Sequence, residues 1–221
     1  MAISTAILRL ADYYRRNGFW TTIRRAGLGA KRSLFSSRSV LFYCDLATQS
    51  APPPDLPGSL TVERKKSSAE ICPEDLQEMA SILNPKLAHQ KMKERFGRGA
   101  SLWLIKSRDK LAGYGWTLQG GTIEAHFFPL GQDDVHLFDF HVFPNFRGQG
   151  INPLLVTHIL HRLAEGNAGR AFIEAAEWNQ QQLSSLKKTP VRCLGCARKS
   201  TLFGRTTVWW DKNRTDSKPS Q

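Results

Sequence analysis

The fold is decided by one stretch, Val142-Phe143-Pro144-Asn145-Phe146-Arg147-Gly148-Gln149-Gly150-Ile151-Asn152-Pro153. The apolar segment 135–143 leads into it and predicts a strand. Beyond it, helical spacing predicts a helix over 153–165, with one apolar face made by Leu154, Leu155, Ile159 and Leu163. Asn152 suits the N-cap of that helix, and Pro153 suits its first position. A strand, a glycine loop and a helix N-terminus bring free backbone N–H groups to one place, which suits a phosphate.

Two common phosphate loops do not fit this stretch. A Walker loop needs Lys and then Ser or Thr after its last glycine, and Gly150 is followed by neither. A dinucleotide-binding loop needs a third glycine where Pro153 stands. The remaining pattern is Arg-x-x-Gly-x-(Gly/Ala), beginning at Arg147. The alternative is a glycine-rich strand-to-helix turn that holds no ligand.

This pattern resembles the acyl-CoA-binding motif of the GCN5-related N-acetyltransferase (GNAT) superfamily. The match covers Arg147, Gly148, Gln149, Gly150 and Ile151, and it departs at the sixth position, where Asn152 replaces the usual small residue. The resemblance extends over about residues 60–210. It implies an α/β (α+β) fold, with a mixed, mostly antiparallel central sheet flanked by helices.

The order of predicted elements agrees with that fold. Strands are predicted at 40–46, 60–64, 101–106, 111–118, 122–128, 135–143 and 170–176, and one or two more over 198–210 with a bend at Gly204. Helices are predicted at 72–83, 86–96, 153–165 and 179–188. We therefore divide the chain into a basic N-terminal extension with a Pro-rich linker (1–58), an acyltransferase-like domain (59–211) and a disordered tail (212–221).

The chain of 221 residues is strongly basic, with a formal net charge of +12, so an anionic partner is expected. Residues 1–40 hold eight basic residues and one acid, and apolar residues recur at helical spacing from Ile3 to Tyr14. A basic amphipathic helix of this kind can lie on an anionic membrane surface or pack against the domain. A transit peptide is a further, weaker interpretation of this segment. A nucleic-acid partner is disfavoured because no reading motif accompanies the charge.

Membrane and redox signals are weak. No apolar run reaches the roughly 18 residues that a spanning helix needs, and no secretory signal is recognised at the start. We expect a cytoplasmic protein, with the membrane periphery as the alternative. Among the four cysteines, only Cys193 and Cys196 have metal-ligand spacing, and one such pair is weak evidence for zinc. No metal is therefore expected.

Roles for the loop and its neighbours follow from the resemblance. It implies that the backbone of Val142 and Phe143 holds the thioester of acetyl-CoA or another acyl-CoA, and that the amides of residues 147–152 hold the pyrophosphate. Asn179 matches an Asn that the family often places at the start of the next helix. The family often carries a Tyr seven residues later as the acid for the leaving thiolate, and Leu186 stands there.

Asp139 and His141 are the candidate catalytic residues. Period-two alternation places them on one face of strand 135–143, together with Val135, Leu137 and Phe143. Polar groups in an apolar run are costly unless they are paired or functional, so one of the two is predicted to be the general base. Their alternative role is structural. Glu124 and His126 are predicted to share a face of the preceding strand.

The main hypothesis is an N-acyltransferase in which a small-molecule amine attacks the acyl-CoA directly. Segments 179–188, 202–205 and 209–210 resemble branches of the family associated with bacterial cell-surface polysaccharide biosynthesis, which suggests an amino sugar as acceptor. The alternative is a non-catalytic acyl-CoA-binding or scaffold protein on the same fold. The oligomeric state is not predicted.

Overall fold

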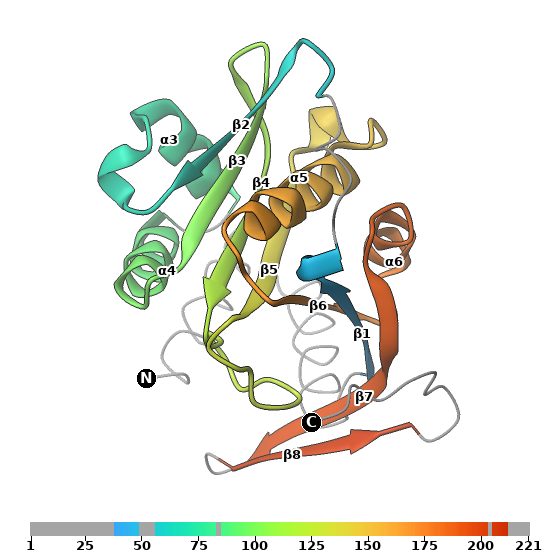
Figure 1. Cartoon of the computed structure of the whole chain (residues 1–221). Coiled ribbons are helices and arrows are strands. Elements are labelled where there is room, and N and C mark those ends of the chain that lie inside the picture. Colours follow the sequence, from blue (N-terminus) through green and yellow to red (C-terminus); the bar gives the residue numbers. More distant parts are fainter. Residues whose placement is uncertain (1–37, 49–55, 83–84, 203–204, 212–221) are drawn as a thin grey trace, which may run out of the picture.

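One eight-stranded sheet organises the computed structural model, which describes residues 38–48, 56–82, 85–202 and 205–211. The strand order is β2-β3-β4-β5-β6-β1-β7-β8, and every neighbouring pair is antiparallel except β5 and β6 (Figure 1). The strands are β1 (Arg38–Asp45), β2 (Leu60–Lys65), β3 (Ser101–Ser107), β4 (Lys110–Gln119), β5 (Asp134–Val142), β6 (Arg170–Ala176), β7 (Arg192–Leu202) and β8 (Arg205–Trp210). The predicted mixed, mostly antiparallel sheet is confirmed.

Within the described residues, two pairs of α-helices flank the sheet. They are α3 (Pro73–Ser81), α4 (Pro85–Gly97), α5 (Ile151–Glu165) and α6 (Gln180–Leu186). Helices α3 and α4 pack on one face, where Met79 and Met92 join Trp116 in an apolar cluster. Helix α5 crosses the other face through Leu155 and Ile159 (Figure 1). Each of the four lies where the sequence predicts a helix, with ends that differ by a few residues.

Strand β1 has an unexpected position. The sequence places it in the N-terminal extension, but it pairs with β6 on one side and β7 on the other, in the interior of the sheet. Leu41, at 1% exposure, and Phe42 are buried in that position. Residues 38–45 therefore belong to the same sheet as the strands of the region predicted as the domain, 59–211.

The strand predicted at 122–128 is wrong, because these residues form an irregular segment between β4 and β5. Strand β4 is already paired with β3 and β5, so it offers no edge to a further strand. Side chains bind the backbone of the segment instead. Arg98 donates to the carbonyl oxygens of Thr122 and Ile123, and Lys199 donates to that of Ala125. Because no strand forms here, the prediction that Glu124 and His126 share a strand face is also wrong.

Several predictions lie outside the described residues. They concern the basic helix before residue 38, most of the Pro-rich linker, the bend at Gly204 and the tail after residue 211. Within the part of the chain that the structure describes, no helix is long and apolar enough to cross a membrane. No disulfide joins the four cysteines, all of which are described.

Candidate active site

Strands β5 and β6 part halfway along their length. Residues 134–137 of β5 pair in parallel with residues 170–173 of β6, and the pairing ends there. Beyond that point β5 remains paired with β4 as far as Val142, and β6 remains paired with β1 as far as Ala176. Beyond Leu137 and Ile173, β5 and β6 therefore no longer pair with each other.

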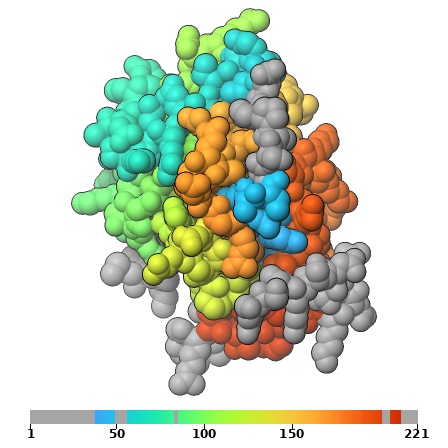
Figure 2. Space-filling model, in the orientation of Figure 1, coloured from blue at the N-terminus to red at the C-terminus, as the bar shows by residue number. Residues whose placement is uncertain are grey.

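A cleft of about 540 Å³ lies beside this divergence. Its walls are the end of β5, the loop that follows, the first turn of α5 and one face of α6. Figure 2 shows α5 as an orange band at the surface, with α6 in red to its right. The predicted site residues that line the cleft are His141, Val142, Arg147, Gly148, Gly150, Ile151, Asn152 and Asn179.

Three predicted residues lie outside the lining of the cleft: Phe143, Gln149 and Asp139, the last of which lines a separate small cavity beside α4. Phe143 is buried, and its backbone N–H donates to the carbonyl oxygen of Ala112 at 3.0 Å. Gln149 is exposed, and its side chain donates to the carbonyl oxygen of Asn145 at 3.0 Å. Phe143 is therefore held by the sheet, and Gln149 is held by its own loop.

The glycines of the loop are required by its backbone. Gly148 and Gly150 have φ angles of 78° and 75°, in the left-handed region that side chains disfavour. No atom lies within 4 Å of a Cβ built on either residue, so conformation and not space demands glycine. A substitution here tests the loop without introducing a clash.

The start of α5 differs from the prediction. The helix begins at Ile151 with Gly150 as its N-cap, not at Pro153 with Asn152 as its N-cap. The left-handed turn at Gly150 brings the chain into the helix two residues earlier, and the Gly150 carbonyl accepts from the Leu154 amide at 3.2 Å. No side chain caps this end of α5, so no capping group competes for its first amides.

Asn152, freed from capping, joins the two walls of the cleft. Its Nδ2 donates to Ser185 Oγ at 2.7 Å and to Gln182 Oε1 at 3.2 Å. Asn179 supports the same wall, because its side chain accepts from the Gln182 amide and caps α6. The departure from the family pattern at Asn152 is therefore a contact between α5 and α6.

The polar face of α6 was missed by sequence reasoning. Gln181, Gln182, Ser184, Ser185 and the following Lys188 all line the cleft. Their spacing is that of one helix face, so the run of polar residues in 180–188 was the available signal. Lys188 and Arg147 both line the cleft and supply positive charge there. The side chain of Arg147 is held by a hydrogen bond in which its Nε donates to the Val142 carbonyl at 3.2 Å.

A β-bulge changes the faces predicted for β5. Tyr114 pairs with His141 and Trp116 pairs with Phe138, so Gly115 alone opposes Asp139 and Phe140. Asp139 carries the strain with a φ of 51°. Gly115 has no Cβ, which leaves room for the ring of Phe140.

The predicted period-two alternation is therefore wrong beyond Phe138. Phe140 and Val142 now pack against the α5 side with Val135 and Leu137. His141 packs on the opposite side, against Tyr114. One inserted residue reverses the faces of the strand, so the side-chain directions before the bulge do not predict those after it.

The two candidate bases have different surroundings. Asp139 pairs with Arg95 at 2.6 Å, and that guanidinium lies 5.0 Å from the ring centroid of Trp116. His141 stacks on Tyr114 with 5.6 Å between ring centroids, and it lines the cleft. Burial, together with the charge of Arg147, lowers the pKa of His141, and the carboxylate of Asp139 acts in the opposite direction. His141 is the more accessible of the two from the cleft.

Comparison with known proteins identifies the class. A family model described as the acetyltransferase (GNAT) family matches residues 69–188, which is more than half of the chain. The chain therefore belongs to this family, as the loop motif and the order of predicted elements indicated. No curated protein matches it.

Solved structures share the fold at low identity. The acetyltransferase from the GNAT family of Colwellia psychrerythraea is 13% identical with a TM-score of 0.51, and the match covers 72% of this chain and 56% of that one. A tandem GNAT protein from the clavulanic acid biosynthesis pathway is 14% identical with a TM-score of 0.50, and the match covers 76% of this chain and 55% of that one. The chain thus spans little more than half the length of these two relatives.

Proposed function

We propose that this protein is an acyl-CoA-dependent N-acyltransferase that moves an acyl group, most simply acetyl, to a small-molecule amine. One observation carries the proposal: a cleft of about 540 Å³ joins the divergence of β5 and β6 to the uncapped start of α5. A long ligand with a phosphate at its middle and a reactive end fits such a cleft, because the amides meet the phosphate and the opened sheet receives the reactive end.

The residues present suit an acyl-CoA. Amides of the 147–152 loop and the side chains of Arg147 and Lys188 would hold the pyrophosphate, since all of them present positive charge or N–H donors. The polar face of α6 would line the path of the pantetheine arm. The bound thioester supplies an activated acyl group, and the protein's own residues position it and move protons.

His141 is the residue we assign as general base. An amine must lose a proton as it attacks, and a neutral imidazole accepts it. The lowered pKa keeps His141 neutral at physiological pH. Asp139, which is paired with Arg95, has the supporting role of raising the basicity of His141 through its charge.

Ser185 is the residue we assign to the departing thiolate. Leu186 occupies the place where the family often carries Tyr, and it is fully buried in the core. The neighbouring Ser185 lines the cleft, and its Oγ accepts from Asn152. The hydroxyl hydrogen of Ser185 can be donated in a hydrogen bond that stabilises the thiolate sulfur, while Asn152 fixes the position of the oxygen and the thiolate takes its proton from water.

An amino sugar remains the acceptor that we propose, on the resemblance of segments 179–188, 202–205 and 209–210 to polysaccharide branches.

The non-catalytic alternative is favoured by one observation, which is the replacement of the expected Tyr by Leu186. Turnover separates the two: binding of acetyl-CoA without thiol release across a panel of amines and amino sugars would leave only the binding protein.

Calorimetric titration with acetyl-CoA tests the donor site. We expect binding by the full chain and about tenfold or greater weakening in Gly148→Ala, because a side chain in the left-handed region costs about 1–2 kcal/mol and shifts the loop. Gly121→Ala is the matched control, since its Cβ also meets open space but its φ is ordinary. No binding of acetyl-CoA or of longer acyl-CoAs by the folded protein would refute the proposal.

A further inference from the structure

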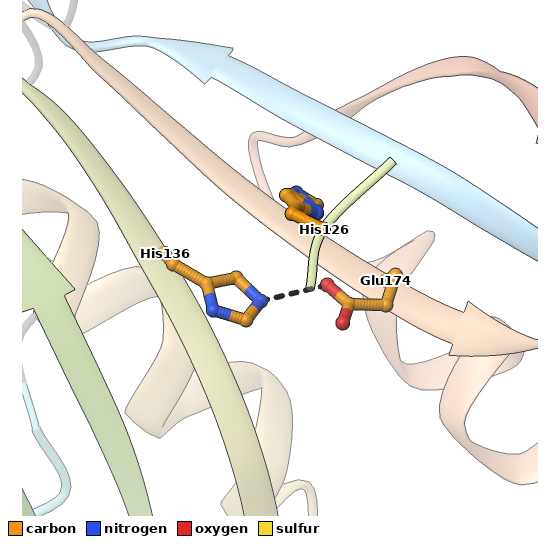
Figure 3. A group of neighbouring side chains, drawn as sticks. All are labelled: His126, His136 and Glu174. Carbon is orange, nitrogen blue, oxygen red and sulfur yellow. Dashed lines mark hydrogen bonds and ion pairs between the residues drawn. The ribbon is translucent and has the colours of Figure 1, made fainter. Parts of the chain in front are cut away.

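A second group of reactive side chains lies outside the cleft. His136 of β5 and Glu174 of β6 face each other where the two strands begin to part, and His126 approaches them from the segment between β4 and β5 (Figure 3). Their nitrogen and oxygen ligand atoms all lie within 4.8 Å of one another. The His136 Nε2 to Glu174 Oε2 distance is 2.8 Å.

The hydrogen bonding of this group is incomplete. Among the residues that the structure describes, both ring nitrogens of His126 and Nδ1 of His136 are buried without a hydrogen-bond partner. His136 itself is 6% exposed. Buried polar atoms without partners are rare and costly, and an ion held by this group would engage one of the unpartnered nitrogens of His126.

We propose that His126, His136 and Glu174 form a binding site for a divalent transition-metal ion of the zinc class. Two imidazoles and one carboxylate are a recurrent ligand set for Zn²⁺, with a fourth position left to water. Imidazole nitrogen selects transition metals over Mg²⁺ and Ca²⁺, which prefer oxygen. The site is independent of the proposed acyltransferase activity.

To bind one ion, the distances between the ligand atoms must shorten by at most about 1.5 Å. Ligand atoms about 2.0–2.1 Å from a tetrahedral ion lie about 3.3 Å apart, and these lie within 4.8 Å. The ion would replace the hydrogen bond between His136 Nε2 and Glu174 with two bonds to the metal. Neutral His136 then carries its hydrogen on Nδ1 and binds the ion through Nε2.

The surrounding structure holds the ligands in place. The ring of His136 stacks on Phe138 at 5.2 Å, and that of His126 lies 5.0 Å from Phe128. Next to His126, Phe127 is buried and the Ala125 carbonyl accepts from Lys199. His126 is therefore fixed on both sides in the chain, although its segment is irregular.

Charge in the cluster depends on Glu174. An imidazole binds a metal in its neutral form, so Glu174 supplies the negative charge of the ligand set. The ammonium group of Lys199 lies nearby and repels a metal cation. It donates to the Ala125 carbonyl and lies 4.7 Å from the ring centroid of Phe127. The carboxylate of Glu174 offsets this repulsion, so its charge is needed for binding.

Zinc titration of the full chain, freed of metal by chelator, tests the proposal. We expect saturation at one ion per chain by calorimetry and elemental analysis, and ligand-field absorption in the visible when Co²⁺ is used as the probe. His126→Ala and Glu174→Gln should each weaken binding by more than about 100-fold, because even loss of an outer-shell partner costs about 10–100-fold. His89→Ala is the matched control, an exposed histidine on α4, and should bind as the parent does.

Stability gives a second readout. Zn²⁺ at about 100 times its Kd should raise the Tm of the parent by roughly 5–10 °C, and should leave the Tm of His126→Ala unchanged. We expect metal-free His126→Ala to be folded, because the deleted ring nitrogens have no partners among the described residues. Equal affinity in the parent and His126→Ala, or the absence of saturable binding, would overturn the site.

Discussion

At the residue scale, His141 governs the expected pH dependence. A general base acts when neutral, so kcat/KM for the amine should fall as pH falls through the pKa of His141. Burial lowers that pKa, so the acid limb should lie below the ordinary histidine value of about 6.5. His141→Gln should lose about 10²–10⁴-fold in kcat and lose the acid limb. A pH profile of thiol release measures both.

Asp139→Asn sharpens this prediction. The carboxylate of Asp139 raises the pKa of His141, so its removal should move the acid limb to still lower pH. Asn accepts the left-handed backbone at this position, so the bulge should persist. Asp109→Asn is the matched control, an exposed aspartate in the same backbone region. A limb that Asp139→Asn leaves in place would remove Asp139 from its supporting role.

At the element scale, the contact between α5 and α6 should determine the affinity for acyl-CoA. Asn152→Ala removes two side-chain hydrogen bonds to α6 but keeps the backbone amide of the loop. We expect acetyl-CoA to bind about fivefold to tenfold more weakly, corresponding to about 1–1.4 kcal/mol of lost positioning. Calorimetry measures the change. Gln149→Ala, whose side chain contacts only its own loop, should bind as the parent does.

Elements were predicted well where periodicity was long and poorly where backbone details decided. Helix α5 and strand β6 follow directly from their apolar spacing. The start of α5 was missed because two left-handed glycines turn the chain early, and a sequence shows glycine but not its φ. The loop of the cleft was predictable from its motif. The face of α6 that completes the cleft carries no apolar signal, so it was overlooked.

The faces of β5 show a second limit. The bulge at Asp139 inserts one residue, and its only trace in the sequence is a glycine, Gly115, on the neighbouring strand. The cluster of His126, His136 and Glu174 was invisible for a related reason. Its members lie far apart in the sequence and meet only through the pairing of β5 with β6 and the path of an irregular segment.

At the scale of the whole molecule, β1 should be essential to stability. Leu41 is buried on an interior strand of the sheet, so Leu41→Ala should lower the free energy of unfolding by about 2–5 kcal/mol. Leu154→Ala, the same change at a partly exposed position, should cost no more than about 1 kcal/mol. Urea unfolding midpoints compare the two. A loss in Leu41→Ala no larger than the roughly 1 kcal/mol expected for Leu154→Ala would contradict the prediction.

The place of β1 also has a consequence for biosynthesis. Ser39 pairs with Ala176 and with Ala197, so the first described strand finds both of its partners in the last part of the chain. Contacts between distant parts of a chain form slowly, because a long loop must close before they are gained. During translation, β1 is made before β6 and β7, and it waits for them with its edges and apolar side chains unpaired. The nascent chain cannot complete this part of its sheet until β7 has been made, and until then it presents the kind of surface that chaperones recognise.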